Sequence, residues 1–590
     1  MSYRHSWTLI LIAGVLVGYA WLFKNPFSEN RATADRRLFP ELAATAVTSL
    51  EIRQADLQIR LAQTNETWHL VHPIHYPAEA PKVQALVADL LQLEYQSQVD
   101  TSTAPPHDGQ ELYGFDNSNR SLTVATDTAS LQLDIGDTEG AGNIAFVRRS
   151  DQDNIYTIQA DSLDRFKLEV DYWRDPRVFP HPVSQISELK IEGTETVHLT
   201  RETSGEEWKM IKPVPNARLD QSFVSFFLQE LAELRVGSFE AAIESERQAV
   251  LEFKLSNELD YSIELLGPSP TNPTLHRVRL VAMDTPALIA TAFVNQVLET
   301  ATTFRNPYLL DQDFKFDQIT VQAEETFTLA IDNESQRWTL TEPFQFPADN
   351  RLVAQFVRQL TELRINKFIA DGIVDEIGFG LDFPFRTITF SRSALDFTTP
   401  EITEVLKIRF GLKIQNNLMT HRSDEAAVYA VPFGAVTHLP AYAFQLRDRK
   451  LWNIATDNIT KLKITLPDQS TKIWVRDGTT WQNDDVSLGQ IEAATLNSHL
   501  EELSNVLVES WTSRPPTTSG HYGIGKRAQV EIEIAEGDQT NVKTLKFGSI
   551  SPRGHRYAET DVAGIPTVFE FPGKLYAKLN PVFGLEAHNP

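Results

Sequence analysis

A tryptophan followed five residues later by a proline recurs along this chain, and this repeat most constrains how the chain can fold. Three copies are complete, and a fourth keeps the tryptophan but has valine at the proline position. The copies are Trp68 with Pro73, Trp208 with Pro213, Trp338 with Pro343, and Trp481 with Val486. Steps of 140, 130 and 143 residues separate the four tryptophans. A period this long indicates tandem domains rather than a solenoid of short units.

Alternating apolar residues precede each tryptophan. They are Leu50, Ile52, Leu57, Ile59 and Leu61; Leu189, Ile191, Val197 and Leu199; Ile319, Val321, Phe327, Leu329 and Ile331; and Leu462, Ile464, Leu466, Ile473 and Val475. A period of two with short polar breaks predicts antiparallel strands joined by hairpins. The tryptophan begins one more strand, and we expect the proline to end it, because proline has no N–H for the strand ladder.

An amphipathic helix is predicted after each proline position. Its apolar positions are Val83, Leu86, Val87, Leu90 and Leu91; Val224, Phe227, Leu228, Leu231 and Leu234; Leu352, Phe356, Leu360 and Leu363; and Leu496, Leu500 and Leu503. Because these residues recur at helical spacing, one face of each helix should lie on its sheet. Asp349 or Asn350 is the expected N-cap in the third copy.

The second half of each copy also repeats. It opens with Tyr113-Gly114-Phe115, Phe379-Gly380-Leu381 or Tyr522-Gly523-Ile524, a motif that the second copy lacks. Strands then run to Gly136, Gly267, Gly411 and Gly548, and the first three copies close on Trp173-Arg174-Asp175, Phe304-Arg305-Asn306 and Leu446-Arg447-Asp448. We interpret all these repeated residues as structural anchors: the tryptophans fill cores, and the closing pairs cap turns.

The predicted fold class is therefore α+β. It has four tandem repeats, each an antiparallel sheet of hairpins with one amphipathic helix packed on it, behind an N-terminal transmembrane helix. The predicted domains are residues 1–24 (signal-anchor), 25–46 (tether), 47–180, 181–312, 313–455 and 456–590.

The N-terminal segment from Trp7 to Phe23 has 17 residues without a charge, which is the short end of what spans a bilayer. Trp7, Tyr19 and Trp21 lie where an aromatic belt would lie. A buried core helix and a cleaved signal peptide are the alternatives, but Gly18-Tyr19-Ala20 is a poor cleavage pattern. The basic residues after the segment favour the opposite orientation. We nevertheless expect the bulk of the chain outside the cytoplasm, since a long domain can be translocated despite its charges.

The net charge and the amino-acid composition argue against several classes of function. The net charge of −25 disfavours nucleic acid, whose binding depends on neutralising phosphates with Lys and Arg. The chain has no cysteine, which excludes disulfides, zinc–thiolate sites and cysteine nucleophiles.

The sequence nominates no catalytic, cofactor-binding or metal-binding residue. His69, His72 and His75 recur every third residue, but the other copies lack them, so we interpret them as solvated loop residues rather than metal ligands. Gly140 to Asn143 lacks the spacing of a phosphate-binding loop and reads as a hairpin turn. Asp151 to Asn154 lacks the distant Glu of a calcium loop and reads as a hairpin tip.

Together these motifs make the chain resemble the Domain of Unknown Function 4340 family. The pattern is carried in the first copy by Leu50, Ile52, Trp68, Leu70, Pro73, Ala78, Glu79, Tyr113, Gly114, Ile135 and Gly136. In the third copy it is carried by Trp338, Leu340, Pro343, Ala348, Asp349, Phe379, Gly380, Leu381, Arg447 and Asp448. The resemblance implies a membrane-anchored bacterial protein that faces the periplasm and is paired with ABC transporter permeases of the gliding-motility type.

Three functions are compatible with the sequence. The first is a non-enzymatic accessory subunit of an ABC transporter or cell-envelope complex, tethered to the inner membrane and acting through protein–protein contacts. The second is an extracytoplasmic binding module for envelope polysaccharide or peptide, for which exposed aromatic residues along a groove would argue. The third is a hydrolase, which needs converging titratable groups that the sequence does not nominate.

Overall fold

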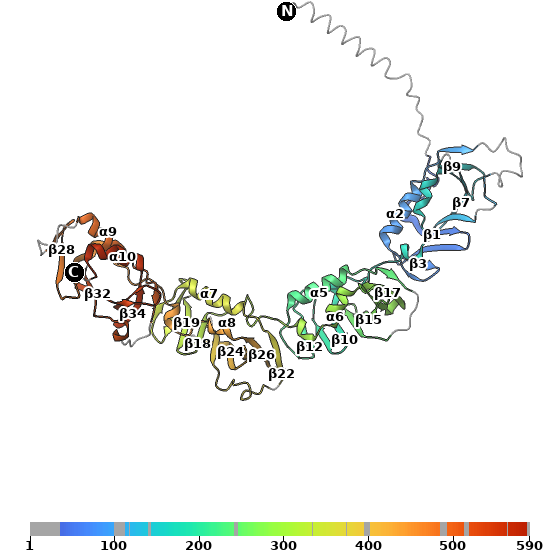
Figure 1. Cartoon of the computed structure of the whole chain (residues 1–590). Coiled ribbons are helices and arrows are strands. Elements are labelled where there is room, and N and C mark those ends of the chain that lie inside the picture. The colour runs from blue at the N-terminus through green and yellow to red at the C-terminus, as the bar shows by residue number, and fades with distance from the viewer. Residues whose placement is uncertain are drawn as a thin grey trace, which may run out of the picture. The chain divides into compact units, whose positions relative to one another are not determined.

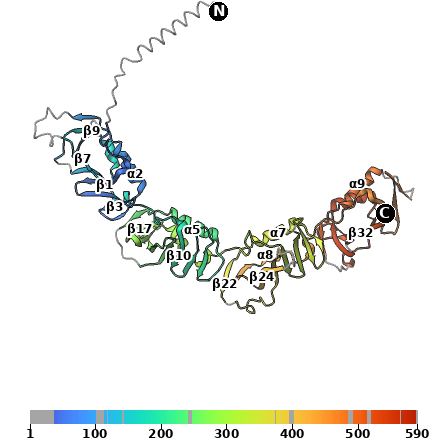
Figure 2. The ribbon, with the colours of Figure 1, turned by 180° about the vertical axis from the view of Figure 1, so that it is seen from behind.

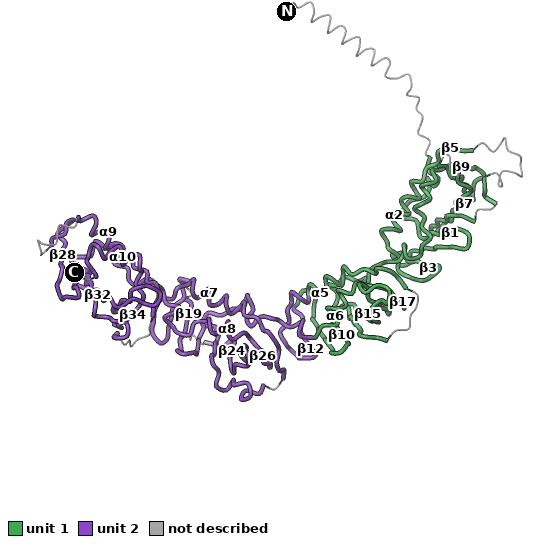
Figure 3. Tube along the Cα trace, viewed as in Figure 1, with its two compact units in different colours: residues 1–206, 225–300 green, residues 207–224, 301–590 purple. Residues whose placement is uncertain are grey.

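The computed structural model describes residues 36–586 except 100–112, 117–118, 140–142, 241–245, 333, 373, 394–401, 484–491, 513–518, 538 and 563. The chain divides into two compact units (Figure 3). The first unit holds residues 1–206 and 225–300, and the second holds 207–224 and 301–590. The predicted anchor, Trp7 to Phe23, lies outside the described residues, as do Gly140 to Gly142 and Val486. Within the described part of the chain, no helix has the length and apolar character needed to cross a membrane.

Four antiparallel sheets form the framework, as the alternating pattern predicted. The first has the strand order β4-β3-β2-β1-β6-β7-β8-β9-β5. Its strands are β1 (Val47–Gln54), β2 (Leu57–Thr64), β3 (Thr67–His72), β4 (Tyr76–Pro77), β5 (Ser97–Val99), β6 (Arg120–Thr126), β7 (Ser130–Glu139), β8 (Ile144–Arg149) and β9 (Ile155–Gln159). The sheet thus consists of two meanders, β1 to β4 and β6 to β9, that run outward from the neighbouring strands β1 and β6. The short strand β5 pairs with β9 at the far edge (Figure 1).

Cross-strand register explains why one face of this sheet is apolar. Leu50 on β1 pairs with Leu61 on β2 and with Val124 on β6. Because directly opposed residues share a face, this row is buried together, and Ile52, two residues further along β1, follows it into the core.

The other three sheets repeat the arrangement. In the first unit, the second sheet contains β10 (Ile186–Glu192), β11 (Thr196–Thr200), β13 (Ser238–Phe239), β14 (Ala249–Leu255), β15 (Asp260–Pro268), β16 (Leu275–Leu280) and β17 (Thr285–Ala290). The strand β12 (Lys209–Lys212) falls in the second unit.

The second unit holds the third and fourth sheets, ordered β21-β20-β19-β18-β23-β24-β25-β26-β22 and β29-β28-β27-β31-β32-β33-β34-β30. The third consists of β18 (Gln318–Gln322), β19 (Thr326–Asp332), β20 (Arg337–Glu342), β21 (Phe346–Pro347), β22 (Lys367–Asp371), β23 (Arg386–Ser393), β24 (Ile402–Ile414), β25 (Asn417–Arg422) and β26 (Ala427–Pro432). The fourth consists of β27 (Ile459–Thr465), β28 (Thr471–Asp477), β29 (Thr480–Asn483), β30 (Ser510–Trp511), β31 (Gln529–Glu536), β32 (Gln539–Ile550), β33 (Arg556–Val562) and β34 (Ile565–Phe571).

The predicted amphipathic helices are α2 (Ala80–Leu91), α5 (Gln221–Glu233), α7 (Asn350–Thr361) and α9 (Ala493–Ser504). Asp349 caps α7 as expected, because its carboxylate accepts hydrogen bonds from the N–H groups of Arg351 and Leu352. The buried face of α7 carries Val353 rather than the predicted Leu352, which is only half-buried. In both views α7 runs along its sheet (Figure 2).

Two features were not predicted. A further helix follows the last long strand of each sheet: α6 (Thr291–Leu298), α8 (Phe433–Thr437) and α10 (Gly573–Phe583), and in the first repeat a 3-10 helix (Ala160–Arg165) followed by α4 (Val170–Trp173). In addition, an apolar pair from the segment before each sheet is buried: Leu38 and Phe39, Val178 and Phe179, Leu309 and Leu310, and Leu451 with Ile454. In the first, third and fourth repeats these apolar residues belong to the hydrophobic core of the repeat.

Candidate functional site

The repeated tryptophans lie in or against the cores. Trp68 and Trp208 are 7% and 5% exposed. Trp338 and Trp481 are half-buried and pack against the cores of the third and fourth repeats. These positions suit core anchors better than a row of exposed rings that would receive a ligand.

The repeated prolines mark the ends of strands. Pro73, Pro213 and Pro343 directly follow β3, β12 and β20. Each is joined to the preceding residue by a cis peptide bond.

Two glycine motifs far apart in sequence meet in space. Gly114 adopts a φ of +74°, which favours glycine. A Cβ on Gly136 would lie 2.2 Å from the carbonyl oxygen of Tyr113, and that oxygen accepts a hydrogen bond from Asp137 N–H at 2.9 Å. The strand glycine therefore lets the Tyr-Gly turn close onto the sheet.

The same contact recurs in the third and fourth repeats. A Cβ on Gly411 would lie 2.3 Å from the carbonyl oxygen of Phe379, and one on Gly548 would lie 2.4 Å from that of Tyr522. Gly380 and Gly523 have φ values of +64° and +66°. The first, third and fourth repeats therefore share the same close contact between a strand glycine and the carbonyl of the Tyr-Gly or Phe-Gly turn.

The second repeat, which lacks the Tyr-Gly motif, uses a histidine instead. The N–H of Gly267, which has a φ of +111°, donates to Nε2 of the buried His276 at 3.1 Å. Burial lowers the pKa of His276, with the charge of Arg277 acting in the same direction, so the ring stays neutral and can accept this hydrogen bond.

The closing Arg-Asp motifs fold back onto the residues that begin the first helix of the same repeat. In the third repeat Asp349 N–H donates to Leu446 O and Asp448 N–H donates to Pro347 O. The first repeat forms the same pair between residues 77–79 and 173–175, and the second between 218–220 and 304–306. In each of these three repeats, backbone hydrogen bonds therefore hold the end of the repeat against the start of its first helix.

The closing Asp or Asn also caps a turn, as the sequence predicted. Oδ1 of Asp175, Asn306 and Asp448 accepts a hydrogen bond from the N–H two residues later, at 3.0, 2.9 and 2.9 Å. Such side-chain-to-backbone bonds are the common use of Asp and Asn in turns.

The closing arginine has a role that the sequence did not predict, because it reaches into the next repeat. The guanidinium carbon of Arg305 lies 3.9 Å from the ring centroid of Phe368, and that of Arg174 lies 4.3 Å from Phe239. Arg447 lies 3.9 Å from Trp511 in the same manner. Phe239, Phe368 and Trp511 occupy β13, β22 and β30, the short strand that follows the first helix of each next repeat.

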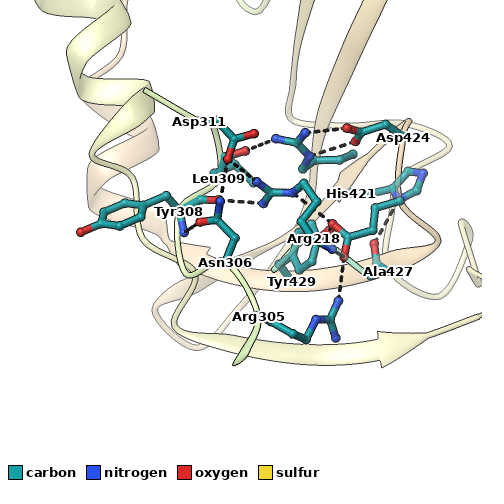
Figure 4. Close-up of polar contacts among 12 residues, drawn as sticks. Arg218, Arg305, Asn306, Tyr308, Leu309, Asp311, His421, Asp424, Ala427 and Tyr429 are labelled. Carbon is teal, nitrogen blue, oxygen red and sulfur yellow. Dashed lines mark hydrogen bonds and ion pairs between the residues drawn. The ribbon is translucent and has the colours of Figure 1, made fainter. Parts of the chain in front are cut away.

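At the junction of the second and third repeats this arrangement widens into a charged cluster (Figure 4). Figure 4 shows Arg218, Arg305 and Tyr429 gathered there, and all three donate hydrogen bonds to Glu425, which is 7% exposed. Its two oxygens accept hydrogen bonds from Arg305 Nη2 at 2.9 Å, from Arg218 Nε at 3.2 Å and from the Tyr429 hydroxyl. Burial, followed by the charge of Glu425, raises the pKa of Tyr429, so its hydroxyl keeps the proton that it donates.

Other donors of the cluster bind the linker between the repeats and the strand β22. Arg218 donates to Asp311 Oδ1 at 3.0 Å and to Tyr308 O at 2.7 Å, while Arg305 Nη1 donates to Asp371 at 2.8 Å. Arg218 stands where the first and third repeats have Pro77 and Pro347, three residues before the helix begins. That substitution is the one sequence signal that could have pointed to this cluster.

In the first and third repeats, another arginine binds a backbone carbonyl of the apolar segment that precedes the sheet. Arg422 donates to Asp424 at 2.9 and 2.6 Å and to Leu309 O. Arg149 likewise donates to Asp151 and, at 2.6 Å, to Leu38 O. The loop from Asp151 to Asn154 is thus the tip of the β8–β9 hairpin, held by Arg149, in line with the predicted hairpin tip.

The geometry therefore describes a set of junctions at which arginines stack on aromatic rings, and between the second and third repeats they also pair with carboxylates. Among the described residues, no group of three or more His, Asp and Glu side chains is arranged to hold a metal ion. The rings of His69 and His75 lie 5.6 Å apart, and His72 is exposed at the end of β3.

Comparison with known proteins assigns the family. The sequence pattern of a domain of unknown function (DUF4340) matches residues 68–252, 208–369 and 338–523, so the three overlapping matches begin at Trp68, Trp208 and Trp338. No curated protein matches the chain. Because the matches together span residues 68–523, well over half of the chain, this protein belongs to the DUF4340 family.

Proposed function

We propose that the chain is a non-enzymatic, membrane-anchored extracytoplasmic protein that acts through protein–protein contacts, as an accessory subunit of an ABC transporter or another cell-envelope complex. The N-terminal apolar segment supplies the anchor in this proposal, and an integral membrane protein such as an ABC permease is the partner. The resemblance of the repeats to their family is the ground for naming that class of partner.

An exposed apolar patch on the third repeat carries the proposal. Ile377, Phe383, Leu412 and Ile414 are 78%, 88%, 49% and 47% exposed. Large exposed apolar side chains that gather on one part of a surface are a feature of protein contact sites. They stand out on a chain whose net charge is −25.

The patch is built from two segments that touch. Leu412 N–H donates to Phe379 O at 2.8 Å, which brings β24 against the loop that holds Ile377 and Phe383. At the junction of the second and third repeats, by contrast, Arg218 and Arg305 are already paired with Glu425.

Affinity purification from the native membrane in mild detergent, followed by mass spectrometry, tests this proposal. The full-length chain should recover an ABC permease or its ATPase, and deletion of residues 1–23 should weaken or abolish that recovery. Ile377→Ser combined with Phe383→Ser should also abolish it. Leu57→Ser, at a position that is 59% exposed on the first repeat, is the matched control and should leave recovery unchanged. Recovery of no membrane protein by the full-length chain would refute the proposal.

A further inference from the structure

A cleft of about 600 Å³ lies within the second unit, where the third repeat meets the fourth. Arg447 from the end of the third repeat lines it, together with Ser510, Trp511, Arg553, Tyr557 and Glu570 from the fourth. Its volume falls within the roughly 300–1,000 Å³ of typical ligand pockets.

Three adjacent strands place a row of polar side chains along this cleft. Glu570 on β34 pairs in register with Tyr557 on β33 and with Ser510 on β30. Because directly opposed residues share one face of a sheet, these three side chains stand side by side. The ring of Tyr522 lies 4.8 Å from that of Tyr557, at an interplanar angle of 70°. The row therefore combines a carboxylate with aromatic surface.

Glu570 has unused capacity to accept hydrogen bonds. Glu570 is only 4% exposed, and its Oε2 atom has no hydrogen-bond partner among the residues that the structure describes. The Arg553 Nη1 atom is 3.9 Å from Oε2, beyond hydrogen-bonding distance, and the Arg553 side chain is largely exposed. Because a buried carboxylate oxygen without a donor is costly, this oxygen is suited to receive a donor from a ligand.

Arg447 has the complementary feature, namely guanidinium N–H groups that are free to donate hydrogen bonds. It is 6% exposed, and its guanidinium carbon lies 3.8 Å from the ring centroid of Phe346 and 3.9 Å from that of Trp511. Two rings at these distances cover both faces of the planar group, so its N–H donors point outward in its plane. In the described part of the chain none of these donors meets an acceptor. Burial lowers the pKa of Arg447 to about 10, against the opposing charge of Asp448, so the group is cationic at neutral pH.

A ligand that satisfies this cleft needs three features: a donor for Glu570, an anionic group for Arg447 and an apolar face for Tyr557. A neutral sugar lacks the anion, and a simple anion lacks the donor. A peptide ammonium group would meet Glu570 beside the like charge of Arg553, whereas a sugar hydroxyl donates without carrying charge.

We propose that this cleft binds a carbohydrate that carries a carboxylate, with its hydroxyls on Glu570, its carboxylate on Arg447 and the C–H face of its ring on Tyr557. This site adds a ligand to the proposed accessory function and does not depend on it. It gives the polysaccharide-binding alternative a defined location.

Calorimetric titration of the purified full-length chain in detergent tests the site. Tetragalacturonic acid is the probe, neutral cellotetraose and tetraglutamate are the comparisons, and only the acidic sugar should bind. Absence of binding by tetragalacturonic acid at millimolar concentration would overturn the proposal. Equal or tighter binding of cellotetraose or of the acidic peptide would overturn it in favour of a neutral-sugar or a peptide site.

Variants locate the binding. Glu570→Gln should weaken binding of tetragalacturonic acid at least tenfold. Glu559→Gln should not change it, because Glu559 is similarly buried on β33 but does not line the cleft. Tyr557→Leu, at a half-buried position, supplies a second test in case Glu570→Gln alters the fold. Unchanged affinity in either variant, when its thermal unfolding matches that of the parent, would overturn the assignment.

Discussion

The strand glycines are the residues where a single added methyl group has the clearest consequence. A Cβ on Gly411 would meet the carbonyl oxygens of Phe379 and Gly380 at 2.3 and 2.9 Å. Because these are backbone atoms, the whole turn must move, and we expect Gly411→Ala to lower the free energy of unfolding by about 2 kcal/mol.

Urea unfolding followed by circular dichroism measures this change. Gly434→Ala is the matched control in the same repeat, because a Cβ at that position meets nothing within 4 Å and the residue lies in α8. Alanine favours helix over glycine, so the control should be neutral or slightly stabilising. A Gly411→Ala variant as stable as this control would contradict the contact.

Asp424 should make the stability of the third repeat depend on pH. Burial alone would raise the pKa of Asp424, but the hydrogen bonds from Arg422 and the charges of Arg422 and Arg218 together outweigh burial and lower the pKa from its ordinary value. A carboxyl whose pKa is lower in the folded state stabilises the fold above the unfolded-state pKa, near pH 4, and loses this contribution as the pH falls through the folded-state pKa.

Asp424→Asn should therefore be less stable than the parent at pH 7, and the difference should shrink at pH 3.5. Urea midpoints at both pH values measure it. Asp313→Asn, which removes the same charge from an exposed position, should show no such convergence. A difference that persists unchanged at pH 3.5 would show that the charge of Asp424 does not contribute.

At the residue scale, the sequence predicted well those side chains whose role is local. The apolar positions of α2 and α9, the Asp349 cap and the turn-capping Asp448 follow from spacing and from chemistry within a few residues. The pairing of Gly136 with Tyr113 was not predicted, although both motifs repeat along the chain, because 23 positions separate them. Periodicity carries no information on which distant turn meets which strand.

At the scale of elements, the closing turn joins one repeat to the next. Its backbone pairs with the residues before the first helix of its own repeat, and its arginine stacks on the next repeat. None of these partners is near the arginine in sequence, since Arg305 and Glu425 are 120 residues apart. The sequence identified the turn as structural but could not identify its partners.

The charged cluster predicts a specific pattern of coupled stabilities. Arg305→Met leaves Glu425 and Asp371 without one of their partners, and removing one member of a buried ion pair costs about 3 kcal/mol or more. Glu425→Gln should also destabilise. The double variant should lose less than the sum of the two, by about 1–3 kcal/mol, because the removed groups interact directly.

A double-variant cycle from urea unfolding measures that coupling. Hydrogen exchange of residues 305–311 shows whether the loss is local to the junction. Arg351→Met is the control, because the Arg351 side chain is 84% exposed and lies 3.9 Å from its carboxylate neighbour. Strict additivity of Arg305→Met and Glu425→Gln would mean that the cluster does not fasten the repeats.

At the scale of the whole molecule, each repeat uses residues that precede its own sheet. The predicted boundaries near 180, 312 and 455 rest on the closing motifs, and they remain predictions. The structure buries Leu309 and Leu310 completely, and both belong to the core of the third repeat. Two apolar residues are too few to show the period of a strand or a helix, so the sequence alone suggests that they belong to a linker.

This placement predicts how fragments of the chain behave. A fragment of residues 307–590 keeps Leu309 and Leu310, whereas a fragment of residues 313–590 lacks them and also lacks the Leu309 carbonyl that Arg422 binds. Full burial of one leucine contributes about 1.5–3 kcal/mol. The third repeat of the shorter fragment should therefore be less stable by about 3–6 kcal/mol, as a lower urea midpoint would report. The fourth repeat, whose apolar residues Leu451 and Ile454 lie in both fragments, is the internal control. Equal midpoints for the third repeat in the two fragments would show that this apolar pair is dispensable and that a domain can begin at residue 313.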